Sequence, residues 1–201
     1  MLVTCGALAV IAAWVPFADI DQVSALVVVA LGVLGYTAYQ LGLAFGVFST
    51  GSTVLGTVDG RRVRQQYRLV SRSWLEISSG GRPVWQPVFY EPALSVLTPT
   101  ELELTGRSVL QGNTRFYPSG RVRTTEPAGK LVDNPSRPSE TPAFGVARRL
   151  VLDVQPAIGA PLVGLLWVYV MNGGLGAFIA ATTVAAATFT WLSAIRGSDP
   201  S

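Results

Sequence analysis

The sequence predicts an α+β membrane protein, with four transmembrane helices in two hairpins around a small inserted cytoplasmic β-barrel or sandwich domain. Only 13% of the 201 residues are charged, about half of the roughly 25% usual in soluble domains. Fourteen of the 15 basic residues and nine of the 12 acidic residues lie between residues 59 and 153, and long uncharged stretches lie on either side. We therefore divide the chain into an N-terminal transmembrane hairpin (1–49), a small β-domain (50–125), a Pro-rich extended linker (126–149) and a C-terminal transmembrane hairpin with a short tail (150–201).

The N-terminal hairpin is predicted from two uncharged runs that are separated by Asp19 and Asp21. A membrane helix needs about 20 apolar residues, and the run from Gln22 to Val58 exceeds this length. Met1–Ala18 is shorter and could be a signal peptide, but it lacks the basic segment with which such peptides begin. We favour a retained membrane helix that ends in a tight turn near Pro16.

The C-terminal hairpin is predicted from two more uncharged runs, Val154–Met171 and Leu175–Ile195. Asn172-Gly173-Gly174 between them is a strong turn signal. Pro156 and Pro161 fall in the first turns of the third helix, where proline is tolerated.

Basic residues set the expected orientation, because cytoplasmic flanks are enriched in Lys and Arg. Arg61 and its neighbours follow the second span, and Arg148 and Arg149 precede the third, whereas the other two connections carry no basic residue. We expect a multi-pass protein of the plasma membrane, with the central domain and both termini in the cytoplasm.

Small residues recur at intervals of four in the predicted spans, which places them on one helix face and lets another backbone approach closely. This face would dock a partner helix or pack within the chain itself. Its residues are Ala38, Gly42 and Gly46 in the second span, and Gly173, Ala177, Ala181 and Ala185 in the last. Gln40, a lone polar side chain in the second span, is expected to bond between helices. No charge lies within a span, which argues against an ion-coupled transporter.

The central domain is predicted to contain five to seven short strands joined by turns, so we expect a small barrel of the OB or SH3 kind. Asp59-Gly60 is a favoured hairpin turn, and Ser78–Gly81 marks a second hairpin. Residues 92–97 could form one helical turn, and strands are expected near 101–104, 109–110 and 114–117. Residues 126–147 carry four prolines and should be irregular, because proline blocks helices and central strands.

No catalytic, cofactor or metal site is predicted. Without histidine, Ser-His and Cys-His nucleophile pairs cannot form. Glu101 and Glu103 would share one face of a strand, as acid–base pairs require, but this spacing is also typical of a solvated strand face. Cys5 is expected to pack as a small apolar residue. We therefore expect a protein that is not an enzyme.

Four arginines at the start of the central domain could contact anionic lipid head groups, each at about 1 kcal/mol near a membrane surface. They are Arg61, Arg62, Arg64 and Arg68. Topology alone explains the same cluster. Nucleic-acid binding is disfavoured, because no platform of aromatic and basic residues accompanies it.

Three segments carry a resemblance to a known group of proteins. They are Trp85–Leu94, Phe116–Arg123 and Asp133-Asn134-Pro135, with further support from Leu166–Val170 and Arg196–Ser201. The chain resembles conserved actinobacterial, especially mycobacterial, membrane proteins, and in particular accessory subunits of mammalian-cell-entry (MCE) lipid transporters. The resemblance implies a stabilising or regulatory role beside a permease, and it implies no functional residues. The expected partners are other integral membrane subunits of a permease and ATPase complex.

The expected function is that of a non-catalytic accessory subunit of a larger inner-membrane complex, most consistent with the transport of fatty or mycolic acids. One alternative is a stand-alone oligomeric transporter or channel. A second is an accessory subunit of a respiratory or cell-envelope biosynthesis complex.

Overall fold

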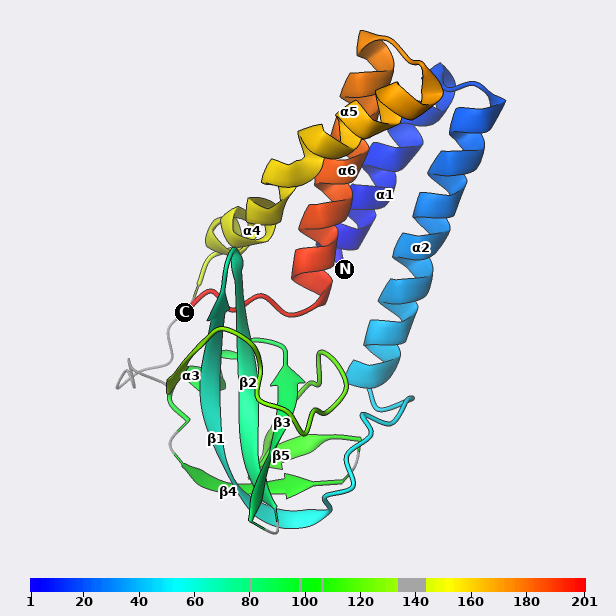
Figure 1. The fold of residues 1–201 in the computed structure, drawn as a ribbon. Helices are drawn as coiled ribbons and strands as arrows, with labels where there is room; N and C mark the ends of the chain where they lie inside the picture. The colour runs from blue at the N-terminus through cyan, green and yellow to red at the C-terminus, as the bar shows by residue number, and fades with distance from the viewer. Residues whose placement is uncertain (80, 98, 106, 134–143) are drawn as a thin grey trace. The chain divides into compact units, whose positions relative to one another are not determined.

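The computed structural model describes residues 1–79, 81–97, 99–105, 107–133 and 144–201. Within these ranges the chain forms two compact units (Figure 1). The helical unit comprises Met1–Ala38 and Asp153–Ala194, and the sheet unit comprises Tyr39–Leu152 and Ile195–Ser201. The predicted α+β class is confirmed.

The first helical hairpin consists of α1 (Leu2–Trp14) and α2 (Ile20–Ala44). They are joined by a 3-10 turn at Val15–Phe17 that has Pro16 near its start. The Asp19 carboxylate accepts a hydrogen bond from the backbone N–H of Gln22 at 2.8 Å, which satisfies a donor at the beginning of α2. The turn predicted at Pro16 and Asp19 is confirmed.

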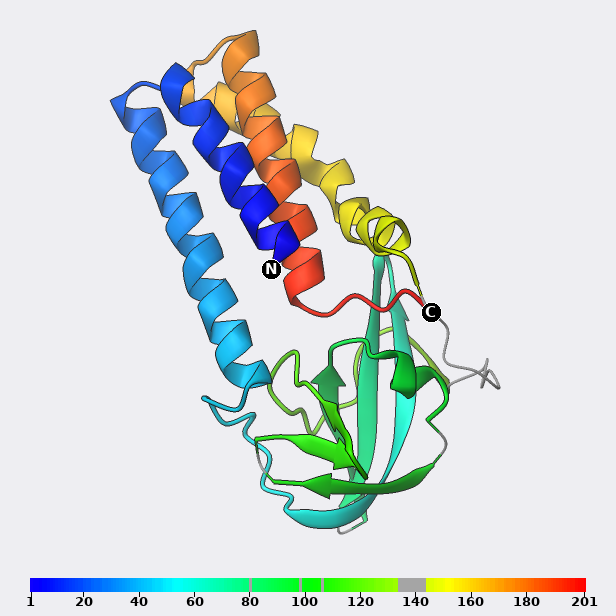
Figure 2. The same cartoon turned by 180° about the vertical axis from the view of Figure 1, so that it is seen from behind.

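The second hairpin consists of α5 (Ala160–Met171) and α6 (Leu175–Ile195). Asn172 adopts the left-handed conformation at φ +51° and ends α5. The turn predicted at Asn172–Gly174 is therefore confirmed. In both views of the chain α1 and α6 lie side by side (Figures 1 and 2).

Three helical segments among the described residues are long and apolar enough to cross a membrane: Ile20–Ala44, Val146–Met171 and Leu175–Ile195. This is the pattern of a multi-pass membrane protein. Leu2–Phe17, which covers the expected first span, is an apolar helix below that length.

The helix that contains the expected third span begins earlier than the sequence predicts. α4 (Val146–Val154) precedes a 3-10 segment at Gln155–Gly159, and α5 follows it directly. Pro156 has no N–H to donate, and its ring clashes with the carbonyl of the residue four positions earlier. The regular α-helical hydrogen bonds are therefore interrupted at Pro156. Arg148 and Arg149, expected in a linker, therefore lie within α4.

The sheet unit is a seven-stranded antiparallel sheet that curls into a half-barrel, with strand order β3-β2-β1-β4-β5-β6 and β7 paired to β1 (Figure 1). β4 and β7 lie end to end along the edge of β1 that β2 leaves free, because β4 pairs with 56–60 and β7 with 63–66. The strands are β1 (Gly56–Tyr67), β2 (Val70–Ser79), β3 (Arg82–Val88), β4 (Thr100–Leu104), β5 (Val109–Gln111), β6 (Thr114–Phe116) and β7 (Lys130–Asp133).

Two prolines explain why the sheet is only half closed. After β6 the chain returns along β3, where the backbone N–H of Ser119 bonds the Pro87 carbonyl at 3.0 Å and Trp85 exchanges two bonds with Arg123. Pro87 and Pro118 have no N–H to donate, so the contact consists of isolated bridges and not a regular ladder.

The hairpin predicted at Asp59-Gly60 is wrong, because β1 runs straight through both residues. The chain turns instead at Arg68, whose φ is +54°. The second hairpin, the helical turn α3 (Pro92–Ser95) and the three later strands agree with the prediction. The Pro-rich stretch is not wholly irregular, since β7 lies within it, and residues 134–143 lie outside the described residues.

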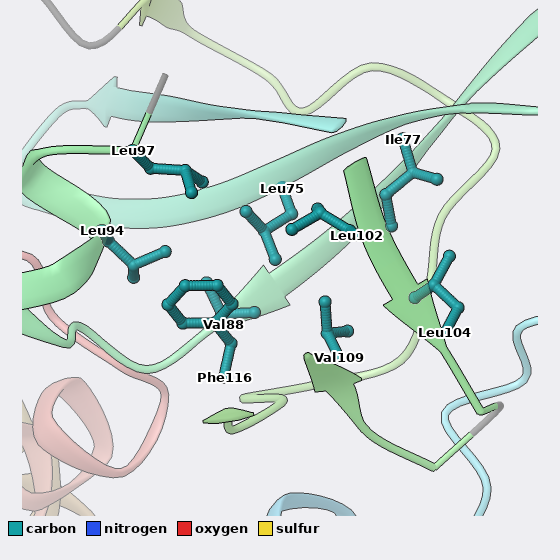
Figure 3. Packing of buried hydrophobic residues seen from close by; sticks show 9 residues of the cluster. All are labelled: Leu75, Ile77, Val88, Leu94, Leu97, Leu102, Leu104, Val109 and Phe116. Atoms are coloured by element: carbon teal, nitrogen blue, oxygen red, sulfur yellow. The ribbon is translucent and has the colours of Figure 1, made fainter. Parts of the chain in front are cut away.

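The core of the sheet unit fills the concave side of the half-barrel. Its nine buried apolar side chains point toward one another, and one of them, Leu94, belongs to α3 (Figure 3). They are Leu75, Ile77, Val88, Leu94, Leu97, Leu102, Leu104, Val109 and Phe116. A smaller cluster of Val63, Trp74 and Trp85 packs with Leu131 of β7. Alternate residues of β2 thus enter different clusters, as strand geometry requires.

Candidate functional site

The small-residue face predicted on the last span lines an apolar groove within the helical unit. Gly173, Ala177, Ala181 and Ala185 all contribute to a cavity of about 740 Å³. We call this cavity the α6 groove. Such a volume lies within the roughly 300–1,000 Å³ typical of ligand pockets.

The groove is walled by all four helices of the unit. Bulky apolar side chains face the small residues of α6 across the cavity, so the opening arises from a size difference between facing helices. Besides the small-residue face, the lining includes Trp14, Phe17, Gln22, Leu26, Val29, Val163, Trp167, Val184, Thr188 and Phe189.

The polar groups of the groove are concentrated at one end. Gln22 lies in the first turn of α2, and Gly173 and Gly174 belong to the turn between α5 and α6. At the other end, the Thr188 hydroxyl donates to the Val184 carbonyl at 2.8 Å, so α6 itself satisfies this group. The Gly173 N–H and the Gly174 carbonyl are likewise bonded within the second hairpin. Gln22 therefore gives the end near the interhelical turns its polar side chain, and the interior of the groove is apolar.

At two glycines of the groove, the packing of the chain would leave room for a side chain. A Cβ at Gly174 or Gly176 would meet no atom within 4 Å. Gly164 in α5 differs, because a Cβ there would overlap the Thr182 hydroxyl and lie 3.1 Å from the Phe178 ring. Close packing of α5 against α6 thus uses Gly164, while the groove face of α6 stays open.

The small residues of the second span do not form one helix face. α2 ends at Ala44, and Gly46 lies beyond it at φ +76°. A Cβ at Gly42 would overlap the Phe48 ring, so the chain itself covers this position. Ala38 is exposed. The expected stripe fails because the helix stops before its last member.

Gln40 has a different role from the one expected. Its side chain is buried, and its Nε2 donates to the Ser119 carbonyl at 3.2 Å within the sheet unit. It therefore ties the end of α2 to the segment that follows β6, and this bond does not join two helices.

The four arginines expected to face lipid head groups lie in different surroundings. Arg61 is 46% exposed and pairs with Glu76 at 2.8 Å. Arg62 is only 2% exposed and pairs with Asp199 at 2.7 Å, so its charge is already neutralised inside the sheet unit. Arg64 is half-buried, and Arg68 is exposed in the turn after β1. Lipid contact remains an expectation for Arg61 and Arg68, and the burial of Arg62 argues against it there.

The remaining chemical groups form no second centre among the described residues. Glu101 and Glu103 are both exposed on β4, as a solvated strand face requires. Cys5 is an exposed residue of α1. Within the same described ranges, no group of three or more His, Cys, Asp or Glu side chains could hold a metal ion.

No family model, curated protein or solved structure matches this chain.

Sequence reasoning missed the Arg62–Asp199 pair, which joins residues far apart in the sequence. It also missed the bulky walls of the groove. The four-residue spacing did find the groove floor, because spacing within one helix is visible in sequence and the facing helices are not.

Proposed function

We propose that this chain is a non-catalytic accessory subunit of a lipid-transport complex in the plasma membrane, and that the α6 groove holds one acyl chain of a lipid. The observation that carries the proposal is the apolar groove on the open small-residue face of α6. The resemblance to accessory subunits of MCE transporters points to the same class of cargo.

The length of the groove suits an acyl chain. From Gly176 to Thr188 the floor follows α6 for about 18 Å, at 1.5 Å per residue. One leaflet of the hydrocarbon core is about 15 Å deep. A single chain of membrane length therefore fits along the floor.

The uneven polarity of the groove suits an amphiphile. A lipid would place its polar group near Gln22 and the Gly173-Gly174 turn, and its apolar chain would extend toward Val184 and Phe189. The lipid would then keep the orientation that it has in the adjoining leaflet, which lowers the cost of leaving the bilayer.

The proposal includes four spans and an inward-facing sheet unit. Leu2–Phe17 would reach about 24 Å as a helix, slightly less than the bilayer core of about 30 Å. Local thinning or polar residues that extend to the interface can accommodate such a mismatch. The arginines of the sheet unit and of α4 would face the cytoplasm, in accordance with the positive-inside rule.

Photo-crosslinking tests whether the groove holds a lipid chain. The full chain is reconstituted in nanodiscs with a phospholipid that carries a diazirine on its acyl chain, and the labelled peptides are mapped. Ala181→Phe fills the groove, whereas Ile179→Phe adds a ring on an α6 residue that is 44% exposed and does not line the groove. We expect labelling of groove residues to fall severalfold in Ala181→Phe and to stay unchanged in Ile179→Phe. Equal labelling in both variants would overturn the assignment of the groove.

Purification from the native membrane tests the accessory role separately. A tagged chain extracted in mild detergent should bring with it a permease and an ATPase, and the complex should lose lipid-uptake activity when the chain is deleted. A chain that purifies alone and forms a closed, conducting homo-oligomer would instead support the channel alternative. Against that alternative, no charged side chain is found among the described residues that line the groove.

A further inference from the structure

The residues that follow α6 lie against the sheet unit and form one isolated bridge with β2. We call Arg196–Ser201 the tail segment. The backbone N–H of Asp199 donates to the Ser71 carbonyl at 2.9 Å, and Ser198 forms an antiparallel bridge with Arg72. β3 pairs with β2 only over residues 73–79, so the beginning of β2 offers an open edge that the tail segment occupies.

Both oxygens of the Asp199 carboxylate are hydrogen-bonded, Oδ2 by the sheet and Oδ1 within the tail segment itself. Its Oδ2 accepts hydrogen bonds from Arg62 Nη2 at 2.7 Å and from Ser73 Oγ at 2.6 Å. Its Oδ1 accepts from the N–H and the hydroxyl of Ser201, at 3.0 and 2.6 Å. The carboxylate is completely buried. An ion pair so far from water is selective, because a neutral replacement would remove the counter-charge of the arginine.

The residues beside Asp199 also make specific contacts with the sheet unit. Arg148 Nε donates to the Pro200 carbonyl at 3.1 Å, and Arg64 Nη1 donates to the Ser201 carbonyl. Gly197 makes the bend into the site at φ +81°, and a Cβ there would lie 3.1 Å from the Ser119 Cβ. Backbone pairing, a buried carboxylate and two carbonyl contacts together resemble the way in which sheet edges bind extended peptides.

The site keeps its cationic half when the tail segment leaves, because Arg62 belongs to β1. Arg62 also contacts two uncharged groups of the sheet unit, the Leu94 carbonyl at 3.4 Å and the Tyr90 ring at 5.8 Å. Departure of the tail segment would therefore take away the Asp199 carboxylate and leave these two contacts in place. Losing one partner of a buried ion pair is unfavourable, and an acidic peptide at the same strand edge would relieve this cost.

We propose that the beginning of β2, with Arg62, Ser73, Arg64 and Arg148, is a peptide-binding site for extended segments with a Gly-x-Asp-Pro-Ser pattern. The tail segment is the tethered ligand of this site and exchanges with the same sequence supplied in trans. While the tail segment is bound, it keeps the site occupied and fixes the chain after α6 to the sheet unit. This proposal rests on the sheet unit alone and is independent of the α6 groove.

A disulfide trap in the full chain tests the exchange. Bridged residues of an antiparallel pair have Cα atoms about 4.5–5.5 Å apart, within the range of about 4.4–6.8 Å that disulfides need. Arg72→Cys with Ser198→Cys, in a Cys5→Ser background, should therefore crosslink rapidly within one chain. An excess of a synthetic Arg196–Ser201 peptide should slow this crosslinking, and the same peptide with Asp199→Asn should not.

Asp199→Asn in the trap chain itself is the counterpart of the altered peptide. Losing the charge of one partner of a buried pair should lower the equilibrium constant for docking of the tail by about 100-fold or more relative to the parent trap, so crosslinking should be slower. Ser201→Gly removes one hydroxyl and keeps the ion pair, so it should slow crosslinking far less. Amide exchange of β1 and β2 in each variant verifies that the sheet unit stays folded.

The two peptides give opposite results if the site is selective. Competition by the native peptide, and not by the peptide that carries Asp199→Asn, supports a selective, exchangeable site. Equal effects of both peptides, or no competition at millimolar concentration while the sheet unit stays folded, would overturn it. Neither result depends on lipid labelling of the groove.

Discussion

Gly60 lies at the point where β1 has a partner strand on both sides, and replacing it with alanine tests this geometry. Gly60 is opposite Ile77 of β2 and Thr100 of β4. An added Cβ would overlap Leu102 Cδ1 and lie 3.2 Å from its Cγ and 3.4 Å from the Glu76 carbonyl oxygen. Leu102 is fully buried in the main core cluster, so it has little room to move aside.

Two opposing effects determine the size of the change. Inserting a methyl group into a well-packed core costs about 1–3 kcal/mol. Replacing glycine by alanine also restricts the unfolded chain, which stabilises by about 0.4–1 kcal/mol where the site can accept it. We expect a net loss of about 1–2 kcal/mol in the free energy of unfolding of the sheet unit, on the basis of these two ranges. At about 4–8 °C per kcal/mol for a small domain, the Tm should fall by about 4–16 °C.

The assay is thermal unfolding of the full chain in detergent, with amide hydrogen exchange of β1 to assign the change to the sheet unit. Leu102→Ala provides the matched background, because it removes the atoms that the new methyl group would meet. There Gly60→Ala should be neutral or stabilising. If Gly60→Ala raises the Tm in the parent chain, the close approach of Gly60 to Leu102 is refuted. A loss of equal size in both backgrounds would also refute it.

Three further changes test other parts of the structure. A cysteine at Asn113, in a Cys5→Ser chain, should resist an impermeant maleimide in intact cells, whereas one at Asn172 should react; reaction at both would contradict the proposed orientation. Gly164→Leu should destabilise the helical unit by several kcal/mol in detergent, because it overpacks the contact between α5 and α6; an unchanged Tm would show that the contact is loose. Burial raises the pKa of Asp199, but its ion pair and hydroxyl donors more than offset this and hold that pKa below the ordinary carboxyl value of 3.8. Stability from this depressed pKa is present above the unfolded value and is lost as pH falls through the folded value, so the amide-exchange protection of the tail, corrected for the intrinsic exchange rate at each pH, should not change between pH 7 and 5, and a loss near pH 5 would contradict the assignment.

Features that depend on neighbours in sequence were predictable. The turns at Asp19 and Asn172, the hairpin between β2 and β3, and the strand pair around Gly112 follow from local residue preferences, and the structure has each of them. The small-residue face of α6 was visible for the same reason, since a spacing of four needs only one helix.

Features that depend on distant partners were not predictable. Asp59-Gly60 has the composition of a hairpin turn, but Gly60 is present because Leu102 approaches it from β4. Gly46 continues the spacing of Gly42 and yet lies beyond the end of α2. In these cases glycine is compatible with a turn, a close side-chain contact or a helix position, and contacts from distant parts of the chain determine which of these occurs.

The pairing of Arg62 with Asp199 also bears on how the chain is made. Arg62 leaves the ribosome early, whereas Asp199 is translated after both helices of the second hairpin. The two can meet only if an even number of membrane crossings separates them, so that both reach the same compartment. Under the proposed topology, closure of this contact therefore excludes chains in which only one of α5 and α6 has crossed the membrane. A chain in which only one of these helices had crossed would lack the Asp199 counter-charge of Arg62, which would leave its sheet unit less stable.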